Sequence, residues 1–595
     1  MERFVYESNN LKETILSSKK ESSLSFAANP RLFSENHLKW SGRTDGRRHE
    51  MKLSSRRIIE LTKELVNIKS VVGTEEENRV SEKLYEVLSA LPYYKEHPED
   101  LFFVENLEDP QRRNSLMAVL KGQKEENSTA VVLIGHIDTV GISDYGALAP
   151  YATNPDLLPD KLKELDLPEA VQKDLESGEY LFGRGVLDMK SGVSMIAHLL
   201  EAASGSLSDF SGNLVACFVS DEEGNSRGML SCVPKLVELK NKEKFHYTVA
   251  IDTDYTSTRT LHDNNRYLYA GTVGKLMPSF YIVGKETHVG DPFGGLDANE
   301  LASELVRKIN LNVALSDESM GEVTVPPVTL RQRDSKPEYS VQTNRDAEVY
   351  FNYATHGITP EKVLAQLKKE AEESFQSVIT KLQAQYDVFT ERMHLPKGTL
   401  PWKVLVLTYE ELFLQVERTF KDLSGHMNAY AEKLLSQGIT DEREVSMHMA
   451  KELTKISGRK EPLMLLYFSP PYYPHMAVTG ETEVEKKLLS ILEGFTDENG
   501  PHPVVFRKFY PYISDLSYFS LPEAEAVEAL KKNMPGFSVS YKLPLEEIRN
   551  LSLPVANIGP YGFDAHQYTE RIEKEYSFEK LPPIFLNTVL GLLEK

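Results

Sequence analysis

The sequence predicts an α/β fold, and three observations support this prediction. Short apolar runs, such as residues 130–134 and 214–219, are bounded by turn residues and alternate with amphipathic helical patterns, as buried strands and their covering helices do. Between residues 274 and 353, strand-like runs flank one helical pattern, which indicates a small inserted α+β domain. At 595 residues the chain exceeds what a single hydrophobic core organises, so we expect two or three domains.

The expected domain boundaries follow changes in these patterns. The N-terminal segment is rich in Ser, Asn, Lys and Arg without a sustained period, so we expect a polar, disordered extension, with Met51 as a plausible alternative start. A helical pattern at residues 409–435 is expected to return the chain to the main domain. The predicted division is an extension at 1–50, a first segment of the main domain at 51–270, the inserted domain at 271–400, and a second segment of the main domain at 401–595.

Composition narrows the classes of partner. The formal net charge of -21 and the pI near 5.3 would repel phosphate backbones and anionic lipids, and no basic cluster offsets them. Only two cysteines occur, Cys217 and Cys232, in no metal-binding spacing, and no stretch approaches the ~20 apolar residues of a membrane span. We therefore expect a cytoplasmic protein that binds a small molecule, without nucleic acid or membrane as a partner.

A histidine follows the first of these apolar runs. Residues 135–139 read Gly-His-Ile-Asp-Thr and place His136 at the carboxyl end of a predicted strand, where open α/β sheets carry functional residues. His136 can ligate a metal there, and Asp138 can accept a hydrogen bond from its other ring nitrogen and fix the tautomer. Taken alone, a histidine at a strand end is more often structural, so the motif needs support from others.

Two acidic motifs supply carboxylates. Residues 183–192 hold Asp188 between glycines at the entry to an apolar helix, where it is either an N-cap or a carboxylate that bridges two cations. Asp221, Glu222 and Glu223 follow the second apolar run, and like charges packed this closely are costly without a cation. Such a run is usually a solvated patch on a surface loop, but at a strand end one glutamate can bind metal while its neighbour moves protons.

The remaining candidates come from a later strand and from the C-terminal region. Residues 246–251 form another apolar run that leads to Asp252, with Asp254 two residues later. His566 adds a second imidazole in the turn-rich loop 559–566. Together these motifs give two histidines and three carboxylates, which suit two borderline cations such as Zn²⁺, Co²⁺ or Mn²⁺ better than Mg²⁺ or Ca²⁺.

In their order along the chain, these motifs resemble those of the M20 metallopeptidase and aminoacylase family, which carries HxD, GRGxxDMK, DEExG, a carboxylate after the next strand and a late histidine. The match spans residues 55–595. The resemblance implies a metal-binding catalytic domain with a mixed sheet and flanking helices, interrupted by a smaller α+β lid domain that makes the dimer contact in many members. It also implies two divalent cations per chain, with Zn²⁺ preferred over Co²⁺ or Mn²⁺.

The resemblance assigns roles to individual residues. Glu222 is the expected general base, and Asp138 is expected to orient the ligating histidine. Asp252 is preferred over Asp254 as a ligand, although both lie at the strand end. The expected metal ligands are His136 for one cation, Asp188 for both, and Glu223, Asp252 and His566 to complete the two sets.

The lid motif bears on substrate choice. Residues 284–298 resemble the family's GxxxHxxxPxxGxNA run and imply that His288 helps to polarise the scissile carbonyl, in dimeric relatives at the neighbouring subunit's site. Many members end a lid strand with an arginine that grips the substrate carboxylate. This chain has Asn352 at that substrate-contacting position, and Asn cannot make a charged bidentate contact. Either another cation, such as Arg345 or Lys275, binds the carboxylate, or the substrate lacks one there.

Three further segments, residues 467–474, 514–518 and 559–566, resemble a subgroup of the family that acts in arginine utilisation, and Asp515 in the second is a candidate substrate-binding residue. We therefore expect hydrolysis of an amide bond in a small peptide or N-acyl amino acid, within amino-acid and arginine catabolism. An aminoacylase and a dipeptidase or carboxypeptidase use the same site, so both stay open. A catalytically silent, ligand-binding member is the other alternative, disfavoured because every ligand and the base are present.

Overall fold

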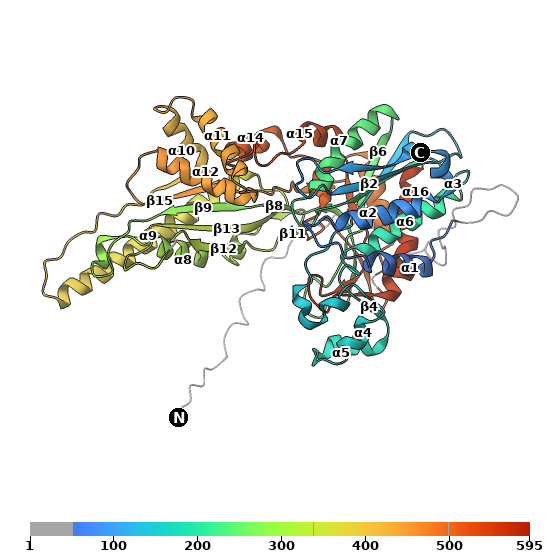
Figure 1. Ribbon diagram of the computed structural model, residues 1–595, viewed down its shortest axis with the longest axis horizontal. Coiled ribbons are helices and arrows are strands. Elements are labelled where there is room, and N and C mark those ends of the chain that lie inside the picture. Colours follow the sequence, from blue (N-terminus) through green and yellow to red (C-terminus); the bar gives the residue numbers. More distant parts are fainter. Residues whose placement is uncertain (1–50, 337, 498, 595) are drawn as a thin grey trace, which may run out of the picture. The chain divides into compact units, whose positions relative to one another are not determined.

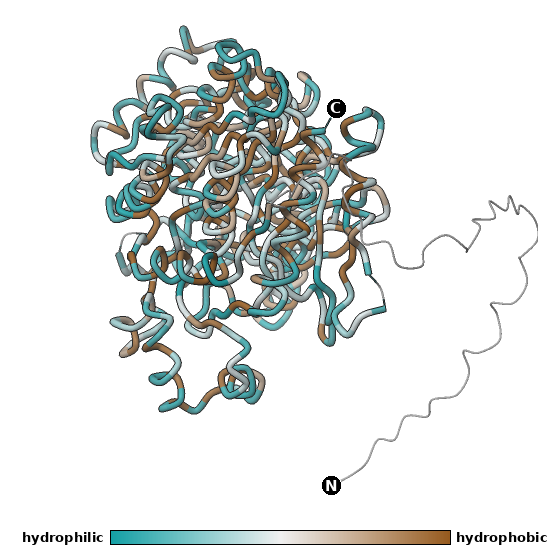
Figure 2. Tube along the Cα trace, turned by 90° about the vertical axis from the view of Figure 1, so that its right-hand side faces the viewer, coloured by the Kyte–Doolittle hydropathy of each residue, from teal (hydrophilic) through white to brown (hydrophobic). Residues whose placement is uncertain are grey.

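The computed structural model describes residues 51–336, 338–497 and 499–594 (Figure 1). The extension expected at residues 1–50 lies outside the described residues. Among the helices that are described, none is long and apolar enough to cross a membrane. Hydrophobic and hydrophilic stretches alternate along the trace, as expected for elements that bury one face (Figure 2).

The larger sheet is mixed and confirms the predicted α/β class. Its order is β1-β2-β5-β3-β6-β18-β7-β16, with β17 also pairing β7. The central strands β5, β3, β6 and β18 run parallel, whereas β1 and β2 are antiparallel to their neighbours. Strand β7 is antiparallel to β18 and β16 but parallel to β17. The strands are β1 (Leu101–Glu105), β2 (Asn114–Lys121), β3 (Thr129–His136), β5 (Asn213–Val219), β6 (His246–Asp252), β7 (Arg266–Thr272), β16 (Met476–Ala477), β17 (Val504–Arg507) and β18 (Val555–Asn557).

Helices cover both faces of this sheet, which explains why its central strands are apolar throughout. Along β3, Val131 and Leu133 pack into one hydrophobic core, while Val132 and Ile134 point to the opposite face and join another. The first core includes α1 (Ser55–Val66), α2 (Glu77–Ser89), α6 (Lys190–Ser204) and α16 (Leu581–Leu593). The second includes α7 (Arg227–Lys242), α15 (Leu545–Leu551) and the short helix η5 (Asp515–Phe519).

A second sheet of six strands forms the inserted region. Its order is β12-β13-β9-β15-β14, with β8 also pairing β13. Helices cover both faces of this sheet (Figure 1). The strands are β8 (Gly274–Leu276), β9 (Pro278–Val283), β12 (Val328–Asp334), β13 (Asp346–Thr355), β14 (Val406–Thr408) and β15 (Leu463–Phe468), and the helices are α8 (Ala298–Ile309) and α9 (Pro360–Arg392), then α10 (Tyr409–Glu417), α11 (Leu423–Ser436) and α12 (Glu442–Ile456).

The inserted region is longer than the expected range of 271–400. Strands β14 and β15 pair within its sheet, and helices α10–α12 pack on Tyr281, Leu463 and Leu465 from that sheet. The chain returns to the larger sheet only at β16, which pairs with β7. The pattern at 409–435 therefore does not return the chain to the main domain as expected, because an amphipathic period shows that a helix has an apolar face but not which sheet that face covers.

Candidate metal centre

The fold brings the separate motifs to one edge of the larger sheet. Parallel strands β3 and β6 end at His136 and Asp252, and β5 ends immediately before the loop with Glu222 and Glu223. Because the strands are parallel, these carboxyl ends lie side by side. A small sheet of β4 (Tyr180–Phe182), β19 (Gly562–Phe563) and β20 (Arg571–Glu573) joins the segment before Asp188 to the loop with His566.

Two groups of potential ligands share Asp188. One contains His136, Asp188 and Asp254, and the other contains Asp188, Glu223 and His566, with the ligand atoms of each group within 4.8 Å of one another. His136 Nε2 lies 2.9 Å from Asp188 Oδ1, and His566 Nε2 lies 3.0 Å from Asp188 Oδ2 and 2.9 Å from Glu223 Oε1. The two oxygens of Asp188 thus face different groups, as a carboxylate that bridges two cations requires.

The structure brings Asp254, and not the Asp252 preferred from the sequence, together with His136 and Asp188. The Asp252 side chain accepts a hydrogen bond from Ser514 Oγ at 2.6 Å and belongs to neither group. Asp254 Oδ2 accepts one from Tyr510 at 2.8 Å and lies with His136 and Asp188. Asp252 is the last residue of β6 and still pairs with β18, whereas Asp254 lies in the segment after the strand. Both acids follow the same apolar run, so the sequence did not separate them.

The charges around these groups fit divalent cations. Burial alone would raise the pKa of Asp188, but hydrogen bonds from His136 and His566 hold it below its usual range. Hydrogen bonds to Asp188 and Glu223 raise the pKa of His566 to about 10. Two imidazoles therefore lie among a larger number of carboxylates, and a nitrogen and oxygen donor set of this kind suits Zn²⁺ or a similar ion.

Glu222 lies beside the ligand groups without belonging to either. Its Oε2 is 4.0 Å from His136 Nε2, and its side chain is 11% exposed. Burial raises the pKa of Glu222 well above its usual range, and the negative charges of Asp515 and Glu223 add to this effect. A carboxylate with a raised pKa next to a metal centre is suited to accept and return a proton.

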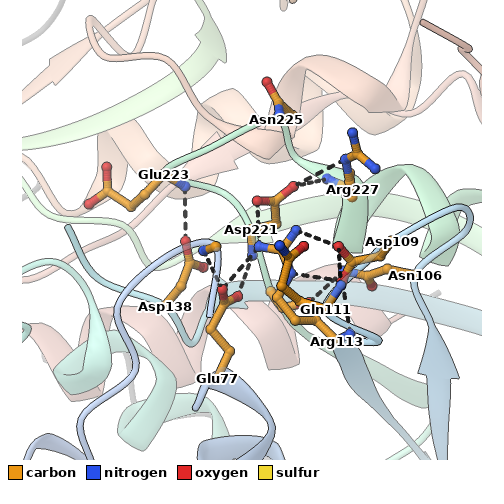
Figure 3. A network of polar contacts seen from close by, with 12 residues as sticks. Glu77, Asn106, Asp109, Gln111, Arg113, Asp138, Asp221, Glu223, Asn225 and Arg227 are labelled. Atoms are coloured by element: carbon orange, nitrogen blue, oxygen red, sulfur yellow. Dashed lines mark hydrogen bonds and ion pairs between the residues drawn. The ribbon is translucent and has the colours of Figure 1, made fainter. Parts of the chain in front are cut away.

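Asp138 holds both the histidine and the acidic loop. Its carboxylate accepts hydrogen bonds from the backbone N–H of Glu222 at 3.2 Å and of Glu223 at 3.0 Å (Figure 3). Its Oδ1 lies 3.6 Å from Nδ1 of His136, and the backbone oxygen of Asp138 lies 3.1 Å from the same nitrogen. The backbone oxygen of Asp138, and not the carboxylate expected from the sequence, is thus the atom within hydrogen-bond distance of His136, while the carboxylate holds the loop of Glu222 and Glu223.

A buried ion-pair network lies behind the acidic loop and was not predicted from the sequence. Arg113 Nη1 lies 2.6 Å from Asp221 Oδ1 and 3.0 Å from Glu77 Oε1, and Arg113 Nε lies 2.8 Å from Asp109 Oδ2 (Figure 3). Glu77 also accepts a hydrogen bond from the backbone N–H of Asp221 at 2.9 Å. Asp221 has a φ of 66°, an uncommon value for a residue other than glycine, so these bonds hold a strained start of the loop that carries Glu222.

Glu570 holds the Asp188 segment in a similar way. Its carboxylate accepts hydrogen bonds from the backbone N–H groups of Gly185, Leu187 and Asp188, at 2.8, 3.2 and 3.3 Å, and pairs with Arg184 at 2.8 Å. Because Glu570 is distant from Asp188 in the sequence and lies in no motif, only the three-stranded sheet reveals this contact.

Replacing Arg113 by methionine is expected to lower the free energy of unfolding by about 3–5 kcal/mol, because Glu77, Asp109 and Asp221 would remain buried without their common cation. Urea unfolding measures this change. The exposed neighbour provides a matched control, since Arg112→Met removes a cation from the same turn outside the network. Equal stability of the two variants would show that the network contributes little.

The predicted lid residues do not join the cluster within this chain. His288 is exposed, and its Nδ1 accepts a hydrogen bond from Gly290 N at 3.0 Å. Arg345 is exposed, with Nε 3.8 Å from Asp346 Oδ1, and Asn352 pairs with Val328 between β13 and β12. Among the described residues, no contact connects His288, Arg345 or Asn352 to the ligand groups.

Two other residues named from the sequence lie at the site. Asp515, at the start of η5, is 2% exposed, and its charge raises the pKa of Glu222. Lys275, in β8, is close enough for Glu222 to influence its pKa. Of the two cations that the sequence offered for a substrate carboxylate, Lys275 is therefore the one that interacts electrostatically with Glu222.

The sequence of this chain is similar to those of known proteins. The family model described as peptidase family M20/M25/M40 matches residues 132–388. The chain is 33% identical over 558 residues to Protein RocB of Bacillus subtilis (strain 168), covering 90% of this chain and 95% of that protein. It is 29% identical over 187 residues to a succinyl-diaminopimelate desuccinylase of Wolinella succinogenes, covering 31% of this chain and 43% of that protein.

Among solved structures, aminopeptidase PepT from Bacillus cereus ATCC 10987 aligns with a TM-score of 0.48 and 11% identity, covering 91% of this chain and 100% of that chain. The family assignment depends on the sequence matches, of which the one to Protein RocB extends over nearly the whole chain. The chain therefore belongs to the M20 peptidase family and is a metallohydrolase of that type.

Proposed function

We propose that this protein is a dinuclear metal-dependent hydrolase that cleaves an amide bond of a small peptide or an N-acyl amino acid. The position of Asp188, shared by two ligand groups with Glu222 beside them, is the observation that supports it. The proposed ligands are His136, Asp188 and Asp254 for one cation and Asp188, Glu223 and His566 for the other. Zn²⁺ suits these donors best, with Co²⁺ or Mn²⁺ as alternatives.

The bound cations would lower the pKa of a water molecule and polarise the substrate carbonyl. Glu222 would accept the proton of the attacking water at its carboxylate and return it to the departing amine. Asp138 would keep Glu222 and Glu223 in position through the two backbone N–H groups that it binds. The water oxygen would bond to the carbonyl carbon and the C–N bond would break, while Glu222 carries the proton from the water to the departing nitrogen.

His288 would act from a second copy of the chain. It is exposed on the inserted region, and the family resemblance places the matching histidine at a neighbouring subunit's site. We accordingly propose a homodimer formed through the inserted lid domain, in which His288 of the second copy polarises the scissile carbonyl.

The relatives favour a role in amino-acid catabolism. The resemblance of residues 467–474, 514–518 and 559–566 to an arginine-utilisation subgroup supports a substrate from arginine catabolism, and a desuccinylase among the relatives supports an N-acyl substrate. A cytoplasmic location is part of the proposal. An aminoacylase and a dipeptidase differ only in what lies on the amine side of the scissile bond, so a substrate panel separates them.

The deciding experiment combines metal content with turnover. The purified protein would be assayed for bound metal and for hydrolysis of dipeptides and N-acyl amino acids, before and after chelation. We expect about two cations per chain and a hydrolytic activity that chelation removes and Zn²⁺, Co²⁺ or Mn²⁺ restores. Absence of both metal and turnover after these ions are added would contradict the proposal.

The two aspartates after β6 give a separate prediction. Asp254→Asn is expected to weaken metal binding strongly, whereas Asp252→Asn should change metal affinity by no more than about 10- to 100-fold, as the loss of a supporting residue does. Titration of the metal-free variants with Zn²⁺ measures both affinities. The opposite order would return the ligand role to Asp252.

A further inference from the structure

Two cations from the inserted region lie near the loop that carries Glu222: Arg443 contacts this loop directly, and Lys275 contacts Tyr473, which does. Lys275 in β8 pairs with Tyr473 through the backbone, with N–H to oxygen distances of 2.8 and 3.1 Å, and its Nζ lies 6.0 Å from the centre of the Tyr473 ring. Tyr473 OH lies 2.9 Å from Ser226 Oγ. Arg443, in α12, donates from Nη1 to Asn225 Oδ1 at 3.3 Å. Both cations are therefore anchored within a few residues of Glu222.

Lys275 lacks an anionic partner. Among the described residues, its Nζ makes no hydrogen bond or ion pair, whereas Arg443 pairs with Asp441 at 2.9 Å. Burial and the positive charge of Arg443 together lower the pKa of Lys275 to about 8, although the negative charge of Glu222 opposes them. Holding an ammonium group in these surroundings costs free energy unless an anion binds beside it.

The two lid positions that the sequence suggested for a substrate carboxylate, Asn352 and Arg345, are less suited to bind an anion at the site. Asn352 carries no charge and lies in the β12–β13 ladder, and Arg345 is exposed beside Asp346. By contrast, Lys275 is within range of the charge of Glu222, the group that would act as base, and packs on Tyr473, which bonds to Ser226 of the same loop. A substrate whose carbonyl reached the ligand groups would place a nearby carboxylate within the range of Lys275.

We propose that Lys275, supported by Arg443, binds the free carboxylate of the substrate and makes this protein selective for N-acyl amino acids or dipeptides over their carboxamides. The inference depends on the proposed hydrolase function. The inference predicts that the enzyme prefers substrates with a free carboxylate. It assigns the binding of that carboxylate to Lys275 on β8, and not to the lid-strand position that Asn352 occupies.

The test compares an acid with its amide. kcat and KM would be measured for the best N-acetyl amino acid of the panel and for its carboxamide, in wild type, Lys275→Gln and Lys275→Arg. For Lys275→Gln we expect KM for the acid to rise about 10- to 100-fold, the effect of losing one charge-assisted hydrogen bond, with kcat and the amide kinetics little changed. Lys275→Arg should restore much of the preference. Lys362→Gln, on the exposed surface of α9, is the matched control.

Binding separates this inference from the proposed function. In Zn²⁺-loaded Glu222→Gln protein, calorimetry with N-acetyl-L-arginine and its carboxamide should show a preference for the acid that Lys275→Gln removes. If the variants bind in this way but the wild type hydrolyses no substrate, the proposed hydrolase function would be wrong and the anion site at Lys275 would be supported. The assignment of Lys275 would be wrong if the acid preference survived Lys275→Gln or were lost in Arg345→Gln instead. It would also be wrong if the wild-type site showed no preference for the acid.

The pH profile gives an independent readout. The groups that face Lys275 are Glu222, Arg443 and Tyr473, and burial raises the pKa of Tyr473 well above its usual range, so it stays neutral. Because Lys275 is charged below its pKa of about 8, the ratio of kcat/KM for acid to amide should be constant below this pH and fall above it. In Lys275→Arg the fall should disappear, since arginine keeps its charge. An unchanged ratio across this range in wild type would contradict the proposal.

Discussion

Replacing Glu222 by glutamine is expected to lower kcat about 10²- to 10⁴-fold while both cations stay bound. Glutamine matches the size of Glu222, but its amide cannot accept a proton from water. Glu222 lies outside both ligand groups, so the metal sites should remain intact. Steady-state kinetics and metal analysis of the same preparations measure the two effects together.

The neighbouring glutamate is the control for this prediction. Glu223→Gln makes the same chemical change one residue later, but Glu223 lies with Asp188 and His566 in a ligand group. We expect this variant to lose metal as well as turnover. Near-normal kcat in Glu222→Gln would exclude Glu222 as the base, and loss of metal from it would show that it is a ligand instead.

The sequence predicted that the ligand candidates lie together, because most of them follow directly after strands that run parallel in one sheet. Glu222 and Glu223 follow an apolar run and His136 ends another, and the carboxyl ends of parallel strands share one edge of a sheet. Asp254 shows the limit of this reasoning. The turn that points Asp254, and not Asp252, toward Asp188 depends on contacts with Ser514 and Tyr510, which lie more than two hundred residues away in the sequence.

Other features of the site depend on long-range packing that no local pattern records. Arg113 precedes an ordinary strand, and Glu77 is the third of three adjacent glutamates, yet only their burial against Asp221 makes them important. The end of the inserted region was also misplaced, because β15 is as apolar as the strands of the larger sheet and pairs with β9 instead. In each case the sequence specified the element but not its partner.

Replacing Asp188 by alanine is expected to remove both cations and abolish detectable turnover, the largest effect of any single substitution in the cluster. Asp188 is the one residue common to the two ligand groups, and its two oxygens face His136 and His566 separately. Zn²⁺ should also no longer raise the melting temperature of the variant. A ligand that binds only the folded state raises the free energy of unfolding, by about 2.7 kcal/mol at 100 times its Kd, and the variant would lack this binding.

A comparison of Asp188→Ala with His566→Ala tests whether Asp188 serves both cations. His566 belongs to one group only, so its loss should weaken one cation and leave the set of His136, Asp188 and Asp254 complete. Metal analysis after dialysis should therefore give about one cation per chain for His566→Ala and none for Asp188→Ala. If Asp188→Ala kept one tightly bound cation, the two groups would be independent sites, and a mechanism that needs two bridged cations would have to be abandoned.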